Sequence, residues 1–61
     1  MAIKKIRKII DLYSLLNMFQ KIKTNAINER SLFLSDEFFQ AEINAIDFEI
    51  EKIKREINSL E

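Results

Sequence analysis

Three glutamates, Glu42, Glu49 and Glu56, recur every seven residues and form the most regular set of ionisable side chains in this sequence. In a helix this spacing places all three on one face. Carboxylate-bridged metal sites in helical bundles combine such glutamates with histidines, and this chain contains no histidine. We therefore interpret the three glutamates as the solvated flank of a packing surface. We expect no metal site and no bound cofactor.

Residues able to act as nucleophiles or proton carriers are equally sparse. Four serines are present at positions 14, 31, 35 and 59, but there is no histidine to activate them and no cysteine. Acid–base catalysis near neutral pH usually recruits histidine. The sequence therefore predicts a protein that is not an enzyme, with no catalytic residues and no small-molecule substrate. We expect the serines to be turn, cap and surface residues.

The remaining candidate for chemistry is a basic cluster at the start of the chain, Lys4, Lys5, Arg7 and Lys8. Phosphate groups of nucleic acids bind lysines and arginines that share one surface. The cluster has a single arginine and no interleaved aromatic residue, and the sequence pI is about 6.3. Three interpretations stay open: contact with nucleic acid, contact with a membrane surface, or pairing with an acidic partner or the acidic half of the chain.

An isoleucine ladder in the last third of the chain predicts a helix there, and the three glutamates lie on that helix. Its members are spaced alternately three and four residues apart, which gives a continuous apolar stripe along a helix. The ladder consists of Ile43, Ile46, Ile50, Ile53, Ile57 and Leu60. A second helix must cover this stripe. Isoleucine at both repeat positions also favours three or four associated helices over two.

A helix boundary is readable near the middle of the chain. Ser35 is a suitable N-cap and is followed by two acidic residues, which the helix dipole favours in a first turn. Leu34 and Phe39 occupy the positions of a hydrophobic staple across this cap. We expect helices at about 3–29 and about 36–60, joined by a turn at about 30–35. One continuous helix over the whole length is the alternative.

Charge and apolar spacing favour an antiparallel hairpin. Residues 1–30 carry a net charge of +5 and residues 31–61 a net charge of −5, so the two halves are expected to face each other. A fold near residue 33 places Ile6 opposite Leu60, Ile9 opposite Ile57, Tyr13 opposite Ile53 and Leu16 opposite Ile50. It also places Lys23 near Glu42, Asp11 near Lys54 or Arg55, and Lys4 or Lys5 near Glu61. We expect the first helix to be the more buried, because eight of the eleven residues 9–19 are apolar.

The hairpin leaves apolar residues without a partner, mostly toward the turn. This oligomer or partner patch comprises Leu12, Leu15, Phe19, Ile22, Phe33, Phe38 and Phe48. With 61 residues, no disulfide and an ordering cost of about 1.5 kcal/mol per residue, a lone hairpin rarely buries enough surface. We therefore expect an all-α hairpin assembled into a four-helix-bundle-like homo-oligomer, with dimer or higher order left open.

The function expected from these features is binding. We predict a small accessory protein for protein–protein interaction that associates with itself and with a larger protein, as an adapter, scaffold piece or inhibitor. The alternative is a nucleic-acid-binding regulator that uses the basic N-terminal helix. No signal peptide or transmembrane segment is recognisable, and we expect a cytoplasmic location.

Overall fold

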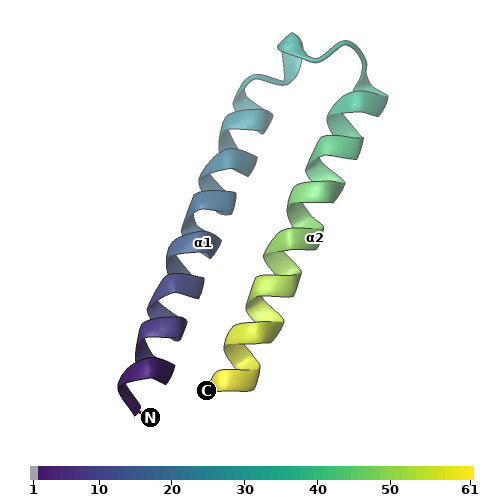
Figure 1. The fold of residues 1–61 in the computed structure, drawn as a ribbon. Helices are drawn as coiled ribbons and strands as arrows, with labels where there is room; N and C mark the ends of the chain where they lie inside the picture. The colour runs from purple at the N-terminus through teal and green to yellow at the C-terminus, as the bar shows by residue number, and fades with distance from the viewer. Residues whose placement is uncertain (1) are drawn as a thin grey trace.

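The chain folds into two long helices that lie side by side in opposite directions (Figure 1). The computed structural model describes residues 2–61. Helix α1 spans Ala2–Asn28, a short 3-10 helix η1 spans Arg30–Leu32, and helix α2 spans Asp36–Leu60. The start of α1 and the end of α2 lie at the same end of a rod with extents of 48 × 15 × 10 Å. The predicted all-α hairpin is confirmed, and the alternative of one continuous helix is wrong.

The start of α2 is stabilised by its cap residue. The Ser35 side-chain oxygen accepts a hydrogen bond of 3.3 Å from the backbone N–H of Phe38, which is one of the unpaired donors of a helix start. Asp36 and Glu37 occupy the first turn, near the positive end of the helix dipole. The predicted N-cap is therefore confirmed.

The turn differs from the predicted staple between Leu34 and Phe39. Leu34 is exposed, and Phe33 packs against Phe39 in its place, with ring centroids 5.4 Å apart and an interplanar angle of 80°. Phe33 has extended backbone, so successive side chains point to opposite sides and an inward Phe33 turns Leu34 outward. The Arg30 guanidinium lies 4.8 Å from the centre of the Phe39 ring and 3.3 Å from the Asp36 carboxylate. The staple prediction is wrong because the larger aromatic ring occupies the inner position.

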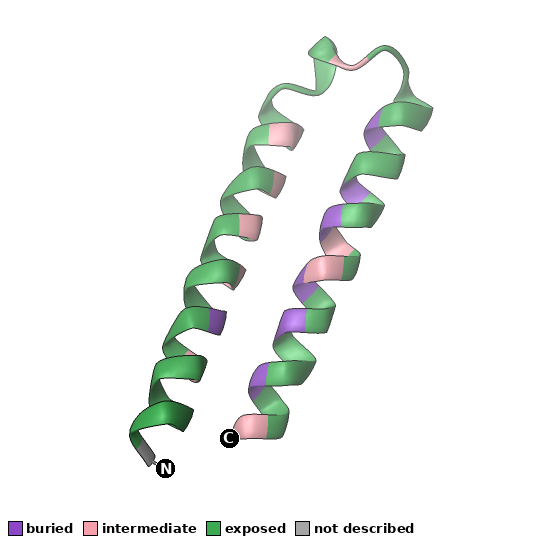
Figure 2. Ribbon diagram, viewed as in Figure 1, coloured by how far each residue is buried: buried purple, intermediate pink, exposed green. Residues whose placement is uncertain are grey.

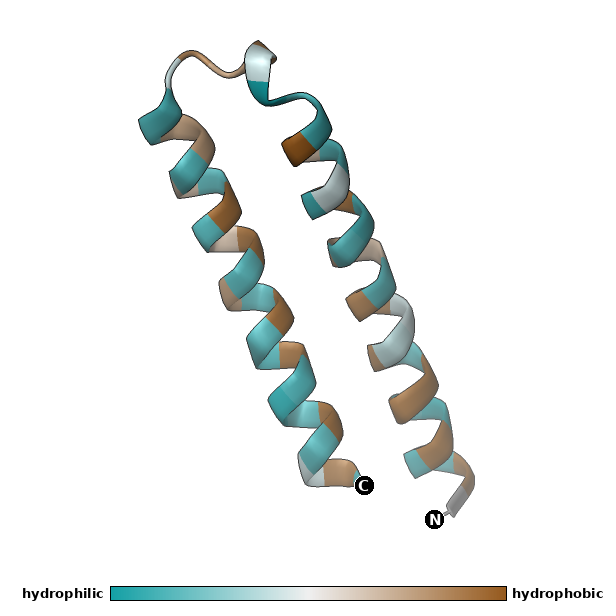
Figure 3. Cartoon of the chain, turned by 180° about the vertical axis from the view of Figure 1, so that it is seen from behind, coloured by the Kyte–Doolittle hydropathy of each residue, from teal (hydrophilic) through white to brown (hydrophobic). Residues whose placement is uncertain are grey.

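Burial is concentrated in α2, as Figure 2 shows. Its buried residues are Phe39, Ile43, Ile46, Ile50, Ile53 and Ile57, whereas Leu12 is the one buried residue among positions 3–28 of α1. The expectation that the first helix is the more buried is therefore wrong. Apolar residues lie around much of α1, but a single neighbouring helix covers only one of its faces. The apolar residues of α2 instead follow one main stripe, which faces α1 (Figure 3).

Candidate interaction surfaces

The surface between the two helices is formed on α1 by a stripe that combines residues predicted to face the second helix with residues predicted to lie in the oligomer or partner patch. Its residues are spaced alternately three and four apart and are buried or half-buried: Ile9, Leu12, Leu16, Phe19, Lys23 and Ala26. Leu12 forms a buried cluster with Ile53 and Ile57. Leu16, Phe19 and Leu60 pack around this cluster. The isoleucine ladder of α2 is thus covered by its own chain along its length.

Two residues predicted to lie in this interface lie outside it. Ile6 is 56% exposed and Tyr13 is 48% exposed, so neither covers Leu60 or Ile53 as expected from the sequence. Each residue of a helix is rotated by about 100° from the one before, so a seam centred on Leu12 turns Tyr13 to its flank. The Tyr13 hydroxyl instead donates a hydrogen bond of 3.0 Å to a carboxylate oxygen of Glu61.

The Glu61 carboxylate also changes the acidity of the phenol. The accepted hydrogen bond, and then the negative charge, raise the pKa of Tyr13 above its usual value of 10.0. Both effects favour the protonated phenol, because ionisation would place a second negative charge beside Glu61 and remove the donated hydrogen. This contact links the first half of α1 to the last residue of the chain.

The ion pair between the helices differs in register from the predicted one. The Lys23 ammonium lies 2.6 Å from the Asp47 carboxylate, not near Glu42. Lys23 occupies a position of the α1 seam, so its side-chain carbons lie along the interface while its charge reaches the edge. Within residues 2–61 the other ion pair is Arg30–Asp36. The pairs expected for Asp11 and for Lys4 or Lys5 are not formed in the described part of the chain.

The predicted oligomer or partner patch is divided by the fold. Leu12 is buried between the helices, and Phe19 and Phe33 are half-buried. Leu15, Ile22, Phe38 and Phe48 are exposed. Met18 is also exposed and was missed, although its spacing from Leu15 and Ile22 is the signal that places it beside them. We call the five exposed residues the turn-half apolar surface: Leu15, Met18, Ile22, Phe38 and Phe48.

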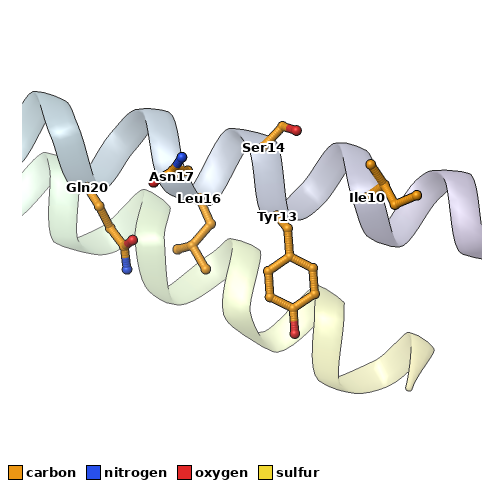
Figure 4. A pocket seen from close by; sticks show the side chains of 6 residues that line it. All are labelled: Ile10, Tyr13, Ser14, Leu16, Asn17 and Gln20. Atoms are coloured by element: carbon orange, nitrogen blue, oxygen red, sulfur yellow. The ribbon is translucent and has the colours of Figure 1, made fainter.

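A further exposed stripe lies on the first half of α1 and was not identified from the sequence. It consists of Ile3, Ile6, Ile10 and Tyr13, again spaced three and four residues apart. Beside it is an open hollow of about 480 Å³, lined by Ile10, Tyr13, Ser14, Leu16, Asn17 and Gln20. In Figure 4 the Tyr13 ring extends from α1 toward α2, whereas Ser14 points to the other side of α1. This hollow borders the stripe without enclosing a site.

The basic cluster Lys4, Lys5, Arg7 and Lys8 is exposed throughout, and none of its members belongs to an ion pair between described residues. The seven-residue glutamate series lies along the flank of the α2 seam, with Glu42 and Glu56 exposed. Over residues 2–61, no group of three or more acidic side chains is arranged to hold a metal ion. In the same residues, no helix is both long and apolar enough to cross a membrane.

The arrangement therefore offers surfaces for contact: one seam used within the chain, and two sets of apolar residues outside it. No protein-family model, curated protein or solved structure matches this chain.

Proposed function

We propose that this protein is a small non-catalytic module for protein–protein interaction, which associates with itself in the cytoplasm and docks a larger protein. In that role it would be an adapter, a scaffold piece or an inhibitor. The observation that carries the proposal is the turn-half apolar surface, whose two phenylalanines, Phe38 and Phe48, are 61% and 62% exposed. Leu15, Met18 and Ile22 share one face of α1, and contiguous exposed apolar side chains are typical of interaction sites.

The energetics of a small chain support the same proposal. Seven of the described side chains are buried, in a chain of 61 residues without a disulfide. A domain of this size is marginal unless it gains further burial, and oligomerisation is a common source of it. Two hairpins packed as a four-helix bundle through their turn halves would cover Leu15, Met18 and Ile22 of α1 together with Phe38 of α2.

Phenylalanine residues make the turn-half apolar surface a better candidate for the partner contact than the exposed stripe on the first half of α1. Interfaces draw most of their binding energy from a few central side chains, among which aromatic residues are enriched. Phe39 is occupied by the turn, where it contacts Phe33 and Arg30. Phe38 and Phe48 have no such role within the chain, so a partner is the expected source of their burial.

Sedimentation of a double variant tests this assignment. We expect Ile22→Ser with Phe38→Ser to dissociate the oligomer while retaining the helical circular dichroism spectrum, because both side chains are exposed in the single chain. The control is Ile27→Ser with Leu34→Ser, which removes two other exposed apolar residues. An oligomer that survives the test pair, or loss of the helical spectrum in the test pair, would refute the assignment.

Nucleic-acid binding is the second candidate, supported by the exposure of the basic cluster. We rank it lower because the same end of α1 carries an exposed apolar stripe, and phosphate contacts do not require one. Fluorescence anisotropy with labelled duplex DNA at low and high salt tests it. Affinity that falls steeply with salt and is lost on replacing Lys4, Arg7 and Lys8 by glutamine would support this alternative.

A further inference from the structure

The first half of α1 has two apolar faces, and α2 uses only one of them. Ile9, Leu12 and Leu16 turn toward α2. Ile3, Ile6, Ile10 and Tyr13 stay outside, with exposed fractions that run from 80% at Ile3 to 48% at Tyr13. We call these four residues the N-terminal stripe. It is a continuous helical face, because its members are separated by three, four and three residues.

Basic residues alternate with the residues of this stripe in the sequence, so both sets lie on the same turns of the helix. Lys4, Lys5, Arg7 and Lys8 are exposed and are not members of the two ion pairs found among residues 2–61. The one acidic residue among positions 2–20 is Asp11. Acidic side chains of α2 therefore do not neutralise this end of α1 through direct ion pairs in the described structure.

We propose that the N-terminal stripe and the basic cluster together bind the surface of an anionic lipid bilayer. The isoleucines enter the boundary between headgroups and acyl chains, and α1 lies in the plane of the membrane. The ammonium and guanidinium groups contact anionic headgroups, with their flexible stems lying along the apolar layer. Tyr13, at the end of the stripe, places an apolar ring in the boundary and a polar hydroxyl at its edge.

Charge complementarity selects this occupant over a second copy of the chain. A twofold contact between two N-terminal stripes would bring the basic clusters of both copies close together, which costs free energy. An anionic bilayer satisfies the charges and the apolar stripe at once. A nucleic acid satisfies only the charges. The proposal goes beyond protein–protein interaction and uses a face separate from the turn-half apolar surface.

Vesicle co-sedimentation tests the proposal with the full chain. The probes are vesicles of phosphatidylcholine alone and of phosphatidylcholine with about one third phosphatidylserine, at low and high salt. We expect binding to the anionic vesicles at low salt, weakened at high salt, and little binding to the neutral ones. Each basic residue near an anionic surface contributes about fivefold in affinity. Lys4→Gln, Arg7→Gln and Lys8→Gln together should therefore weaken binding on the order of 100-fold.

Matched variants distinguish binding through this face from nonspecific adsorption to vesicles. Lys52→Gln, Lys54→Gln and Arg55→Gln make the same change in charge on the other helix, α2, and should retain most of the affinity. Ile6→Ser with Ile10→Ser should abolish vesicle binding, whereas Ile27→Ser with Leu34→Ser should not. All of these side chains are exposed, so circular dichroism should show an intact helical fold in each variant.

Several results would overturn the proposal. They are equal binding to neutral and anionic vesicles, equal loss in the test and control charge variants, and binding to duplex DNA in place of vesicles. Dissociation of the oligomer by Ile6→Ser with Ile10→Ser would also overturn it, because the stripe would then be a contact between copies. Ile22→Ser with Phe38→Ser should abolish self-association and leave vesicle binding unaffected, so the two proposals can fail separately.

Discussion

Replacement of Ile57 by alanine should be among the most damaging single substitutions in the chain. Ile57 is 3% exposed and belongs to the cluster with Leu12 and Ile53. The change removes three side-chain carbons, at about 0.8 kcal/mol each, and leaves space that a two-helix interface can partly close. We expect a loss of about 2–3 kcal/mol in the free energy of unfolding. For a chain of 61 residues this lowers the melting temperature by about 15–25 °C.

The matched substitution is Ile6→Ala, which deletes the same atoms from a side chain that is 56% exposed. Less than half of the transfer free energy is available there, so we expect a loss of about 1 kcal/mol or less. Urea unfolding followed by circular dichroism measures both variants. If Ile6→Ala costs as much as Ile57→Ala, then Ile6 is buried in solution, and the seam centred on Leu12 is refuted.

Three further results are expected. The phenol of Tyr13 should titrate above pH 10 by ultraviolet absorbance, and Glu61→Gln should lower that pKa. Because the pKa of Tyr13 is raised in the folded state, its contact with Glu61 stabilises the fold below pH 10. This contribution is lost as the pH rises through the raised pKa. An unchanged titration of Tyr13 in Glu61→Gln would contradict this account. Lys23→Leu should raise the free energy of unfolding by about 1 kcal/mol, although it removes the ion pair with Asp47. A half-exposed ion pair contributes little, and leucine extends the apolar seam. Destabilisation of this variant in urea would show that the ion pair contributes more than the added apolar contact. Ser35→Ala should cost about 1 kcal/mol through loss of the cap at α2, and thermal unfolding with no change would contradict that role.

The sequence predicted the architecture correctly where the pattern of residues allowed only one interpretation. The α2 ladder repeats without interruption, so its buried face could be predicted residue by residue, and Ile43 to Ile57 are buried as expected. The Ser35 cap carries its own local chemistry and was equally readable. Both features depend on neighbours within one helix, which spacing along the chain describes completely.

The face that α1 presents to α2 could not be predicted from the sequence in the same way. Ile6, Ile9, Leu12 and Tyr13 are all large and largely apolar, so spacing allowed two seams about one residue step apart. The structure selects the seam through Leu12, which exposes Ile6 and Tyr13 and creates the N-terminal stripe. This choice depends on contacts across the hairpin, which spacing alone does not determine.

The turn was predicted at its correct place, but the side chain that packs against Phe39 was predicted wrongly for a related reason. Leu34 and Phe33 both precede the Ser35 cap and both are apolar, and the staple rule selects Leu34 from its position alone. The backbone path out of the 3-10 helix Arg30–Leu32 turns Phe33 inward, where it meets Phe39. A rule based on position in one helix could not include the path of the preceding segment.

Sedimentation-velocity ultracentrifugation of the unmodified protein over a series of micromolar concentrations tests the central proposal most directly. The exposed turn-half apolar surface predicts a dimer or a larger homo-oligomer that retains the helical spectrum at every concentration where it is assembled. A stable, fully helical monomer across the whole series would contradict self-association.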